Sequence, residues 1–248
     1  MDIIGTGFLA RNLRQISERH PGVVALAAGV SDVGRWSPAG EFRREEELVT
    51  GTAAACRRDG RKLLLFSTAS AALYGAPGCS GSEHCAHSPR TPYGGHKREM
   101  ERIVRESGCA WLILRLSHVV GNDQSSHQLV PTLVRQIAEG RVRIFRDSNR
   151  DILDIRDFVR SVDSLLELEL SHEIVNIASG ASVPVESIVT HIAGMLGTNP
   201  RREYVTRDSG HRVSVRKFGA LVPERGVRDP ERYYKAVLDR YVPHYAHH

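Results

Sequence analysis

A chain of 248 residues is long enough for one large α/β domain, or for one domain with a small lobe. Its hydrophobic content of 41% and charged content of 25% are ordinary for a globular protein, and no stretch reaches the roughly 18 apolar residues of a membrane span. The net charge of +5 comes from scattered arginines without interleaved aromatic residues, so we predict neither a nucleic-acid nor a membrane partner. Because no basic segment precedes the first apolar residues, we expect a cytoplasmic protein.

Strands and helices alternate in the hydrophobic pattern, which indicates a parallel sheet with helices on both faces. The predicted strands are residues 1–4, 23–28, 62–67, 111–116, 142–145, 152–154 and 174–177. The predicted helices are residues 8–19, 40–58, 93–107, 129–139, 159–168 and 184–196. The tail from Arg201 is predicted to be irregular until a helix near 229–240.

The four cysteines stand at positions 56, 79, 85 and 109, and we expect them to be reduced thiols. Two of them fall in the turn-rich stretch 75–92, together with His84 and His87. This stretch lacks a tight C-x-x-C pair, so we predict a loop without a metal ion. A zinc site on this loop is the less favoured alternative.

A glycine turn follows the first strand and opens the first helix, in the pattern G-x-G-x-x-A. Small residues there let the backbone approach a pyrophosphate, whose charge interacts with the N–H groups at the start of a helix. The alternative is a purely structural turn. The predicted cofactor-binding residues of this turn are Gly5, Thr6, Gly7, Phe8, Leu9 and Ala10.

Tyr93 and Lys97 have the spacing Y-x-x-x-K, which places both side chains on one face of a helix. The lysine cation favours the phenolate and is expected to lower the pKa of the tyrosine from about 10. A tyrosine tuned in this way can give or take a proton at a sugar or ketone oxygen. The alternative is a chance pair on the surface.

Hydroxyl groups follow the buried strand 62–67 and are expected near the same place. Ser70 is the candidate that holds the substrate oxygen and shares its proton with Tyr93, and Thr68 is the alternative for this role.

Seven motifs, in the same order, resemble those of the NAD(P)-dependent epimerase/dehydratase family, the extended short-chain dehydrogenases/reductases. That family acts mainly on nucleotide-activated sugars and carries a glycine turn, an HLAA-like strand, SS...VYG, YxxxK, LR..NVYGP, RDFIYVDD and NIGSG. The matching segments here are the glycine turn (5–10), ALAA (25–28), STASAALYG (67–75), Tyr93 with Lys97, LRLSHVVGN (114–122), RDILDIRD (150–157) and NIASG (176–180).

The resemblance implies a Rossmann-like doubly wound parallel sheet, with a cofactor-binding domain over 1–121 plus 150–178. A small substrate-binding lobe over 122–149 plus 179–248 would complete it. It also implies NAD or NADP as cofactor, with Lys97 on the nicotinamide ribose, and a homodimer formed through the helices 40–58 and 93–107. The implied sites add Ala27 and Ala28 for cofactor, and Thr68, His118, Asn122, Arg150 and Arg207 for substrate. Arg150 suits a diphosphate because a guanidinium can bind it with two hydrogen bonds, although a surface turn is the alternative.

The sequence departs from the family between the first helix and the ALAA strand, where roughly 40 residues of a doubly wound unit are missing. Two alternatives follow: residues 23–28 are the fourth strand, which we prefer, or they are the second strand and later elements are lost. Either way the adenine half of the cofactor site is reduced, and NAD cannot be told from NADP.

Ala71 and Ala72 stand where dehydratases of this family carry Asp-Glu, which argues against 4,6-dehydration. The sequence therefore predicts an NAD(P)-dependent oxidoreductase that acts on a nucleotide-activated sugar, with reduction of a keto-sugar favoured. The alternatives are an epimerase that works through a transient ketone, and a degenerate module that binds a nucleotide-sugar or a protein without turnover.

Overall fold

The centre of the molecule is a five-stranded sheet in which all paired strands are parallel. A computed structural model describes residues 1–30, 39–75, 78–85, 89, 91–206, 212–225 and 229–246. The strands are short apolar runs, as expected for a sheet that is covered on both faces. In sheet order they are β1 (Asp2–Ile4), β2 (Val23–Leu26), β3 (Lys62–Thr68), β4 (Ala110–Leu116) and β8 (Glu173–Ile177).

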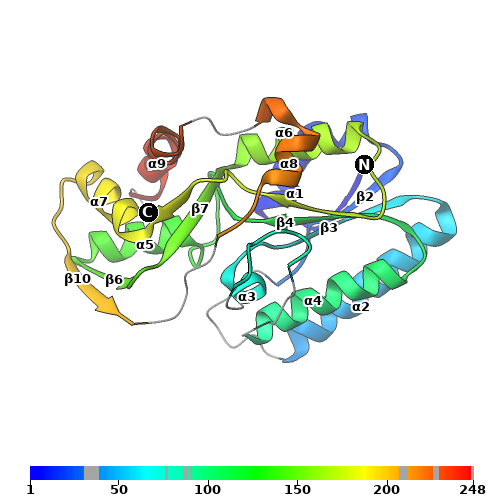
Figure 1. The fold of residues 1–248 in the computed structure, drawn as a ribbon, viewed down its shortest axis with the longest axis horizontal. Coiled ribbons are helices and arrows are strands. Elements are labelled where there is room, and N and C mark those ends of the chain that lie inside the picture. Colours follow the sequence, from blue (N-terminus) through cyan, green and yellow to red (C-terminus); the bar gives the residue numbers. More distant parts are fainter. Residues whose placement is uncertain are drawn as a thin grey trace.

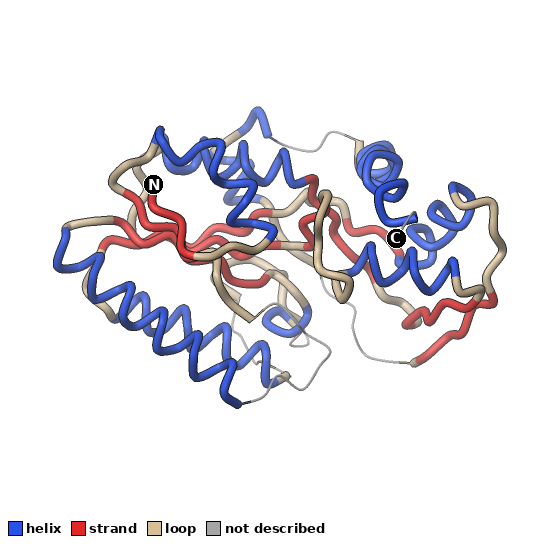
Figure 2. Tube along the Cα trace, turned by 180° about the vertical axis from the view of Figure 1, so that it is seen from behind, coloured by secondary structure: helices blue, strands red, loops and turns tan. Residues whose placement is uncertain are grey.

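Helices cover both faces of this sheet (Figure 1). One face carries α1 (Phe8–Leu13), its 3-10 extension η1 (Arg14–Arg19) and α6 (Ile155–Glu167). The other face carries α2 (Ala39–Asp59) and α4 (Pro92–Glu106), and a short α3 (Ala71–Tyr74) packs against α4. Seen from behind, the sheet runs between these two layers (Figure 2). The predicted Rossmann-like architecture is confirmed.

The strand order decides between the two alternatives for residues 23–28. In a doubly wound fold the order is 3-2-1-4-5-6, so the first strand lies inside the sheet. Here β1 is an edge strand among the described strands, and β2 lies between β1 and β3. Residues 23–28 therefore correspond to the fourth strand, as we prefer above, because a second strand would lie on the far side of β1.

A smaller layer of strands and helices adjoins one end of the sheet. Two short sheets form here, one from β5 (His118–Val120), β7 (Asn149–Asp154) and β9 (Ser182–Pro184), the other from β6 (Arg141–Phe145) and β10 (Arg201–Val205). The helices around them are α5 (Leu129–Ala138), α7 (Val185–Met195) and α9 (Pro230–Ala246). Helix α8 (Arg216–Leu221) packs against β8 of the main sheet and is followed by the 3-10 turn η2 (Pro223–Arg225).

The prediction that the tail is irregular from Arg201 to about residue 229 is wrong for α8 and η2, and it is also wrong for residues 201–205. They form β10, which pairs in parallel with β6 from Arg201 beside Arg141 to Val205 beside Phe145. The strand is largely exposed, so its sequence lacks the buried apolar run that identifies the central strands.

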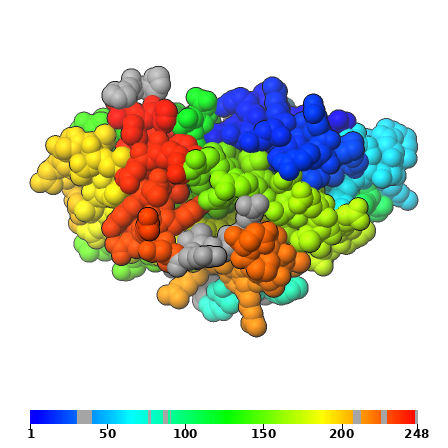
Figure 3. Space-filling view, turned by 90° about the horizontal axis from the view of Figure 1, so that it is seen from above, coloured from blue at the N-terminus to red at the C-terminus, as the bar shows by residue number. Residues whose placement is uncertain are grey.

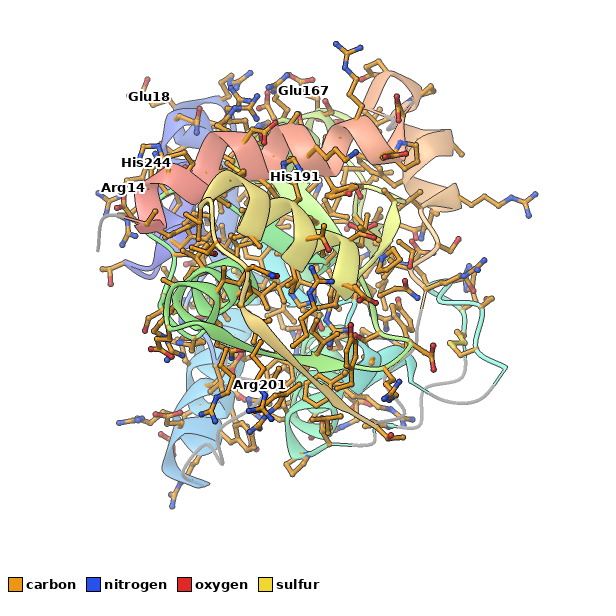
Figure 4. The ribbon with its side chains drawn as sticks, turned by 90° about the vertical axis from the view of Figure 1, so that its left-hand side faces the viewer. Arg14, Glu18, Glu167, His191, Arg201 and His244 are labelled. Atoms are coloured by element: carbon orange, nitrogen blue, oxygen red, sulfur yellow. A yellow bond between two sulfur atoms is a disulfide. The ribbon has the colours of Figure 1, made fainter. Side chains whose placement is uncertain are left out.

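Helix α9 fixes the end of the chain to the rest of the molecule and lies on the surface beside α7 (Figure 3). The buried carboxylate of Asp154 accepts a hydrogen bond from the Tyr241 hydroxyl at 2.8 Å and pairs with Arg240. His191 of α7 lies beside α9 (Figure 4), where its Nε2 is 2.7 Å from Asp239 Oδ1. No helix in the described part of the chain is long and apolar enough to cross a membrane.

The cysteines are not all free. Cys79 and Cys85 form a disulfide with their Cα atoms 5.7 Å apart, so the expectation of four reduced thiols is wrong for this pair. Cys56 and Cys109 are free and buried. The six-residue separation lets the turn-rich segment close on itself, and the bonded sulfurs leave no thiolate there for the alternative zinc site.

A buried polar network holds this disulfide loop against the sheet. Arg115 of β4 donates two hydrogen bonds to Glu101 of α4, at 2.6 and 2.9 Å, and a third to the Tyr74 hydroxyl at 2.8 Å. The same hydroxyl donates to Asn176 Oδ1 of β8 at 2.6 Å, and Glu83 of the loop accepts from the Asn176 backbone at 2.8 Å. These groups satisfy one another, as buried polar atoms must.

The two glycines of the first turn have different structural roles. Gly5 has a φ of +129°, and a Cβ there would lie 2.7 Å from the Ala27 carbonyl oxygen. Gly7 starts α1, and a Cβ there would meet nothing within 4 Å. Only Gly5 is needed for the close approach of the turn after β1 to the end of β2.

We expect Gly5→Ala to lower the free energy of unfolding by about 2 kcal/mol or more, because it adds a strained φ and a clash with backbone. Gly7→Ala is the matched control and should change it by less than about 1 kcal/mol. Urea denaturation of both variants measures the difference, and equal stabilities would contradict the assignment.

Candidate active site

One cavity of about 290 Å³ lies where four strands of the main sheet end. It takes residues from the turns after β1 and β2, from the ends of β3 and β4 and the segments after them, and from α2 and α4. The carboxyl edge of a parallel sheet is where ligands bind in open α/β folds. The lining residues from these elements are Gly7, Phe8, Leu9, Ala27, Ala28, Gly29, Glu45, Ser67, Thr68, Ser70, Tyr93, Lys97, Ser117 and His118; others include Gln124, Ser125, Gln128, Asp151 and Val213.

The start of α4 sets the position of the tyrosine and lysine. The Thr91 side chain caps the helix by accepting a hydrogen bond from the Gly94 backbone at 3.0 Å, and Pro92 occupies the first turn. Tyr93 and Lys97 then lie one turn apart on the same face, with Lys97 Nζ 5.7 Å from the centroid of the Tyr93 ring. Both line the cavity, so the predicted pair is brought together as the spacing indicates.

The direction of the tyrosine pKa differs from the expectation. Burial raises the pKa of Tyr93 and outweighs the Lys97 cation and a hydrogen bond from Thr68, both of which lower it. The charge of Glu45 raises it further. The prediction that Lys97 brings this pKa below its ordinary value is therefore wrong for the protein alone, because the spacing shows the cation but not the desolvation.

Both candidate hydroxyls line the cavity, in different situations. Thr68 hydrogen-bonds Tyr93, and its Oγ1 also accepts from the Ser70 backbone N–H at 3.2 Å. Ser70 precedes α3, and its buried Oγ has no hydrogen-bond partner among the described residues. A buried hydroxyl without a partner at the wall of a cavity is suited to a polar atom of a ligand. Thr68 therefore hydrogen-bonds Tyr93, whereas the Ser70 hydroxyl has no partner among the described residues and is available to a ligand.

Glu45 is a cavity residue that sequence reasoning missed. It comes from α2, and its carboxylate accepts from Lys97 Nζ at 2.7 Å, from His96 Nε2 at 2.9 Å and from the Val30 backbone at 2.9 Å. Burial alone would raise its pKa, but the hydrogen bonds from His96 and Lys97 and the lysine charge lower it to about 2. Glu45 is therefore a buried anion beside the predicted catalytic lysine.

Asp151 is a second residue that was missed, next to the predicted Arg150. Its side chain is buried and accepts from the Ser179 backbone at 2.8 Å, yet burial outweighs its hydrogen bonds and raises its pKa to about 6. It also lines a neighbouring hollow of about 310 Å³ with Arg212, Val213 and residues of the turn before β9. The RD motif thus brings its aspartate, rather than its arginine, to the cavity.

The other predicted residues are only partly brought to this cavity. Of the glycine turn, Gly7, Phe8 and Leu9 line it, whereas the buried Ala10 packs in the core. Ala27, Ala28 and His118 also line it.

The structure does not bring the predicted Gly5, Thr6, Asn122 and Arg150 into the lining of the described cavity. Asn122 is exposed on the loop after β5, and Arg150 Nη1 donates to the Asn149 carbonyl at 2.8 Å. Arg207 lies outside the described residues, as does His87. Within the described residues, no group of three or more His, Cys, Asp or Glu side chains could hold a metal ion.

The fold and the cavity define a class of protein: a Rossmann-like α/β chain with hydroxyl, tyrosine and lysine groups at the carboxyl edge of its sheet. Residues 9–178 match the family model described as the NAD dependent epimerase/dehydratase family. The chain belongs to this family.

Solved structures share the fold over nearly the whole chain. RMD from Pseudomonas aeruginosa, complexed with NADPH, has a TM-score of 0.80 at 18% identity, covering 98% of this chain and 98% of that one. MoeE5 in complex with UDP-glucose and NAD has a TM-score of 0.78 at 20% identity, covering 96% and 97%. UDP-glucose 4-epimerase from Thermus thermophilus, complexed with NAD, has a TM-score of 0.74 at 20% identity, covering 96% and 82%. No curated protein sequence matches the chain.

We expect Asp151→Asn to change stability in a pH-dependent way. A folded-state pKa of about 6, raised from 3.8, means that the wild type loses stability as the pH rises between these values. The variant lacks this loss, so its stability relative to wild type should be roughly 2 kcal/mol greater at pH 8 than at pH 4.

Urea denaturation at both pH values measures this effect. Asp147→Asn, in the exposed turn between β6 and β7, is the control for removing a carboxylate nearby. A stability difference for Asp151→Asn that does not change with pH would show that its carboxyl titrates normally.

Proposed function

We propose that this protein is an NAD(P)-dependent oxidoreductase that reduces a keto group of a nucleotide-activated sugar. The observation that carries the proposal is the cavity at the carboxyl edge, which gathers Tyr93, Lys97 and the open hydroxyl of Ser70 beside the glycine turn. The relatives of similar fold named above are complexed with NAD or NADPH, and one also with UDP-glucose, which supports the proposal. We propose further that two copies pair through α2 and α4, as the family resemblance implies.

The described residues fit the nicotinamide half of such a cofactor better than the adenosine half. Lys97 would hold the ribose, and the backbone at Gly7 and Phe8 would face the phosphates, since a Cβ on Gly7 would meet nothing within 4 Å. Ala27 and Ala28, which follow β2, line the cavity with small side chains and so leave room for the cofactor. The strand that reads the adenosine ribose in a doubly wound fold has no counterpart beyond β1 in the described residues.

When bound, the reduced nicotinamide supplies a hydride to the carbonyl carbon of the substrate. The raised pKa of Tyr93 keeps its hydroxyl protonated at neutral pH, so Tyr93 can donate its proton to the carbonyl oxygen. Ser70 holds that oxygen with its free hydroxyl, and Thr68 hydrogen-bonds Tyr93. Lys97 stabilises the phenolate that remains after the transfer.

The state of Tyr93 favours reduction over epimerisation through a transient ketone. Epimerisation begins with removal of a proton from a substrate hydroxyl, which needs the phenolate. Burial raises the pKa of Tyr93, which favours the protonated phenol that proton donation requires. Ala71 and Ala72 occupy the dehydratase positions on α3 and carry no acid or base.

Cofactor titration tests the proposal directly. We expect NADH and NADPH to bind with dissociation constants within about threefold of each other, because the described structure offers no group that reads the 2′-position of the adenosine ribose. Fluorescence titration measures both constants. Absence of binding of either cofactor at millimolar concentration would exclude the enzyme and leave the non-catalytic alternative.

Substitution of the tyrosine tests the chemistry. Tyr93→Phe should lower the turnover of a keto-sugar nucleotide by about a hundredfold or more, with cofactor affinity nearly unchanged, because it removes only the proton donor. Tyr204→Phe, at an exposed tyrosine of β10, is the matched control and should retain activity. In the wild type, kcat/KM for reduction should fall only above pH 10, since the acid form is required and its pKa is raised.

A further inference from the structure

The ion pair between Glu45 and Lys97 is among the most deeply buried in the described structure. The two side chains are 4% and 6% exposed, and the Nζ to Oε1 distance is 2.7 Å. The second carboxylate oxygen is held by His96 Nε2, also at 5% exposure, and by the Val30 backbone N–H. The His96 ring is stacked on Phe42 of α2, with the centroids 4.2 Å apart. The described partners of the carboxylate are therefore a buried lysine, a buried and stacked histidine and a backbone N–H.

The backbone after β2 is shaped to admit this pair. A Cβ on Gly29 would lie 2.6 Å from Glu45 Oε1 and 3.2 Å from Lys97 Nζ. The φ of Gly29 is outside the left-handed region, so a side chain is excluded here by the ion pair and not by backbone conformation. Any residue other than glycine would push the carboxylate or the ammonium away.

A buried ion pair of this kind contributes little net stability, because the loss of hydration offsets the attraction between the charges. Such an ion pair can instead fix the position of a charged group. Burial without a counter-charge disfavours the charged form of an amine in general. A lysine that is to hold a ribose and stabilise a phenolate needs both its charge and a fixed position.

We propose that Glu45 is a positioning residue that keeps Lys97 charged and directed at Tyr93 before any cofactor enters. The assignment of Lys97 to the cofactor rests on the proposed function, but its fixation by Glu45 does not. An ammonium has three N–H donors, of which Glu45 occupies one among the described residues, so up to two are left for ribose hydroxyls. Glu45 lies behind the lysine and acts through it.

Other ionisable groups share the surroundings of Lys97 and define the controls. His96 faces Glu45 from α4, and Tyr93 faces Lys97 from the same helix. His118, the first residue of β5, and Asp151, from β7, line the same cavity. None of these groups changes in the variants below, so a shift in Lys97 reports the contact with Glu45.

The chain contains only four lysines, which makes a direct measurement possible. Protein with 13C-labelled lysine gives four side-chain signals, and Lys97→Arg assigns the one of interest. Glu45→Gln should lower the pH at which Lys97 loses its proton by about one unit or more, since the counter-charge is gone. Gly29→Ala, which keeps every charge, should move it in the same direction by a smaller amount.

Glu46→Gln is the matched control, because it removes the same charge from the next residue of α2, where the side chain is exposed. Its Lys97 signal should titrate as in the wild type. A Lys97 titration that is the same in Glu45→Gln and Glu46→Gln would overturn the proposal. If Glu45→Gln does not fold, Gly29→Ala alone decides, and an unshifted titration there would also overturn it.

A second measurement separates this proposal from the proposed function. In Glu45→Gln, the loss of NADH affinity with rising pH should set in about one pH unit lower than in the wild type, because the lysine loses its charge at lower pH. A purely structural role would weaken binding by the same factor at every pH. If wild-type protein binds no nicotinamide cofactor but the lysine titration still shifts, the proposed function fails and the role of Glu45 stands.

Discussion

The parallel direction of the strands is the constraint on which the site depends. Because β1, β2, β3 and β4 point the same way, the residue that follows each strand arrives at one edge of the sheet. The glycine turn, the two alanines, the hydroxyls and His118 reach the cavity in this manner, from positions more than 100 residues apart. Tyr93 and Lys97 come instead from α4 and Glu45 from α2, and the cap at Thr91 fixes where α4 starts. The sheet topology therefore brings the residues around the cavity together, although they come from separate segments of the chain.

The connection from β1 to β2 in the shortened sheet has an unusual handedness. The connections from β1 to β2, β2 to β3 and β3 to β4 all step in the same direction, yet α1 packs on one face and α2 and α4 on the other. The first connection therefore has the opposite hand to the next two, although such crossovers are right-handed in nearly all proteins. Loss of the second and third strands explains this. In the full order 3-2-1-4, the first helix connects strand 1 to strand 2, on the side away from strand 4. Here α1 packs on the same face of the sheet but connects β1 to β2, which corresponds to strand 4. The turn at residues 20–22, after η1, leads the chain into β2.

Much of this arrangement could be predicted from the sequence, for identifiable reasons. The central strands are continuous apolar runs, and the motifs follow them directly, so their convergence at one edge could be inferred. Glu45 could not, because it stands in a run of three glutamates on a charged helix, and only the packing of α2 on α4 shows which one is buried. Asp151 was hidden by its neighbour Arg150, since alternation in a strand decides which of two adjacent side chains faces the cavity. Exposed β10 carried no apolar signal.

From the Y-x-x-x-K motif alone, Lys97 would be expected to lower the pKa of Tyr93. The structure contains a balance of four effects: desolvation raises the pKa of Tyr93, Lys97 and a hydrogen bond from Thr68 lower it, and the charge of Glu45 raises it. Entry of a cofactor would exchange water around Lys97 for ribose hydroxyls without removing the carboxylate behind it, so the lysine charge would stay beside the phenol. A phenol that is protonated before the reaction, and a fixed cation that stabilises it afterwards, is the combination that proton donation requires. The buried carboxylate on α2 therefore bears on the charge balance at Tyr93 as well as on the position of the lysine.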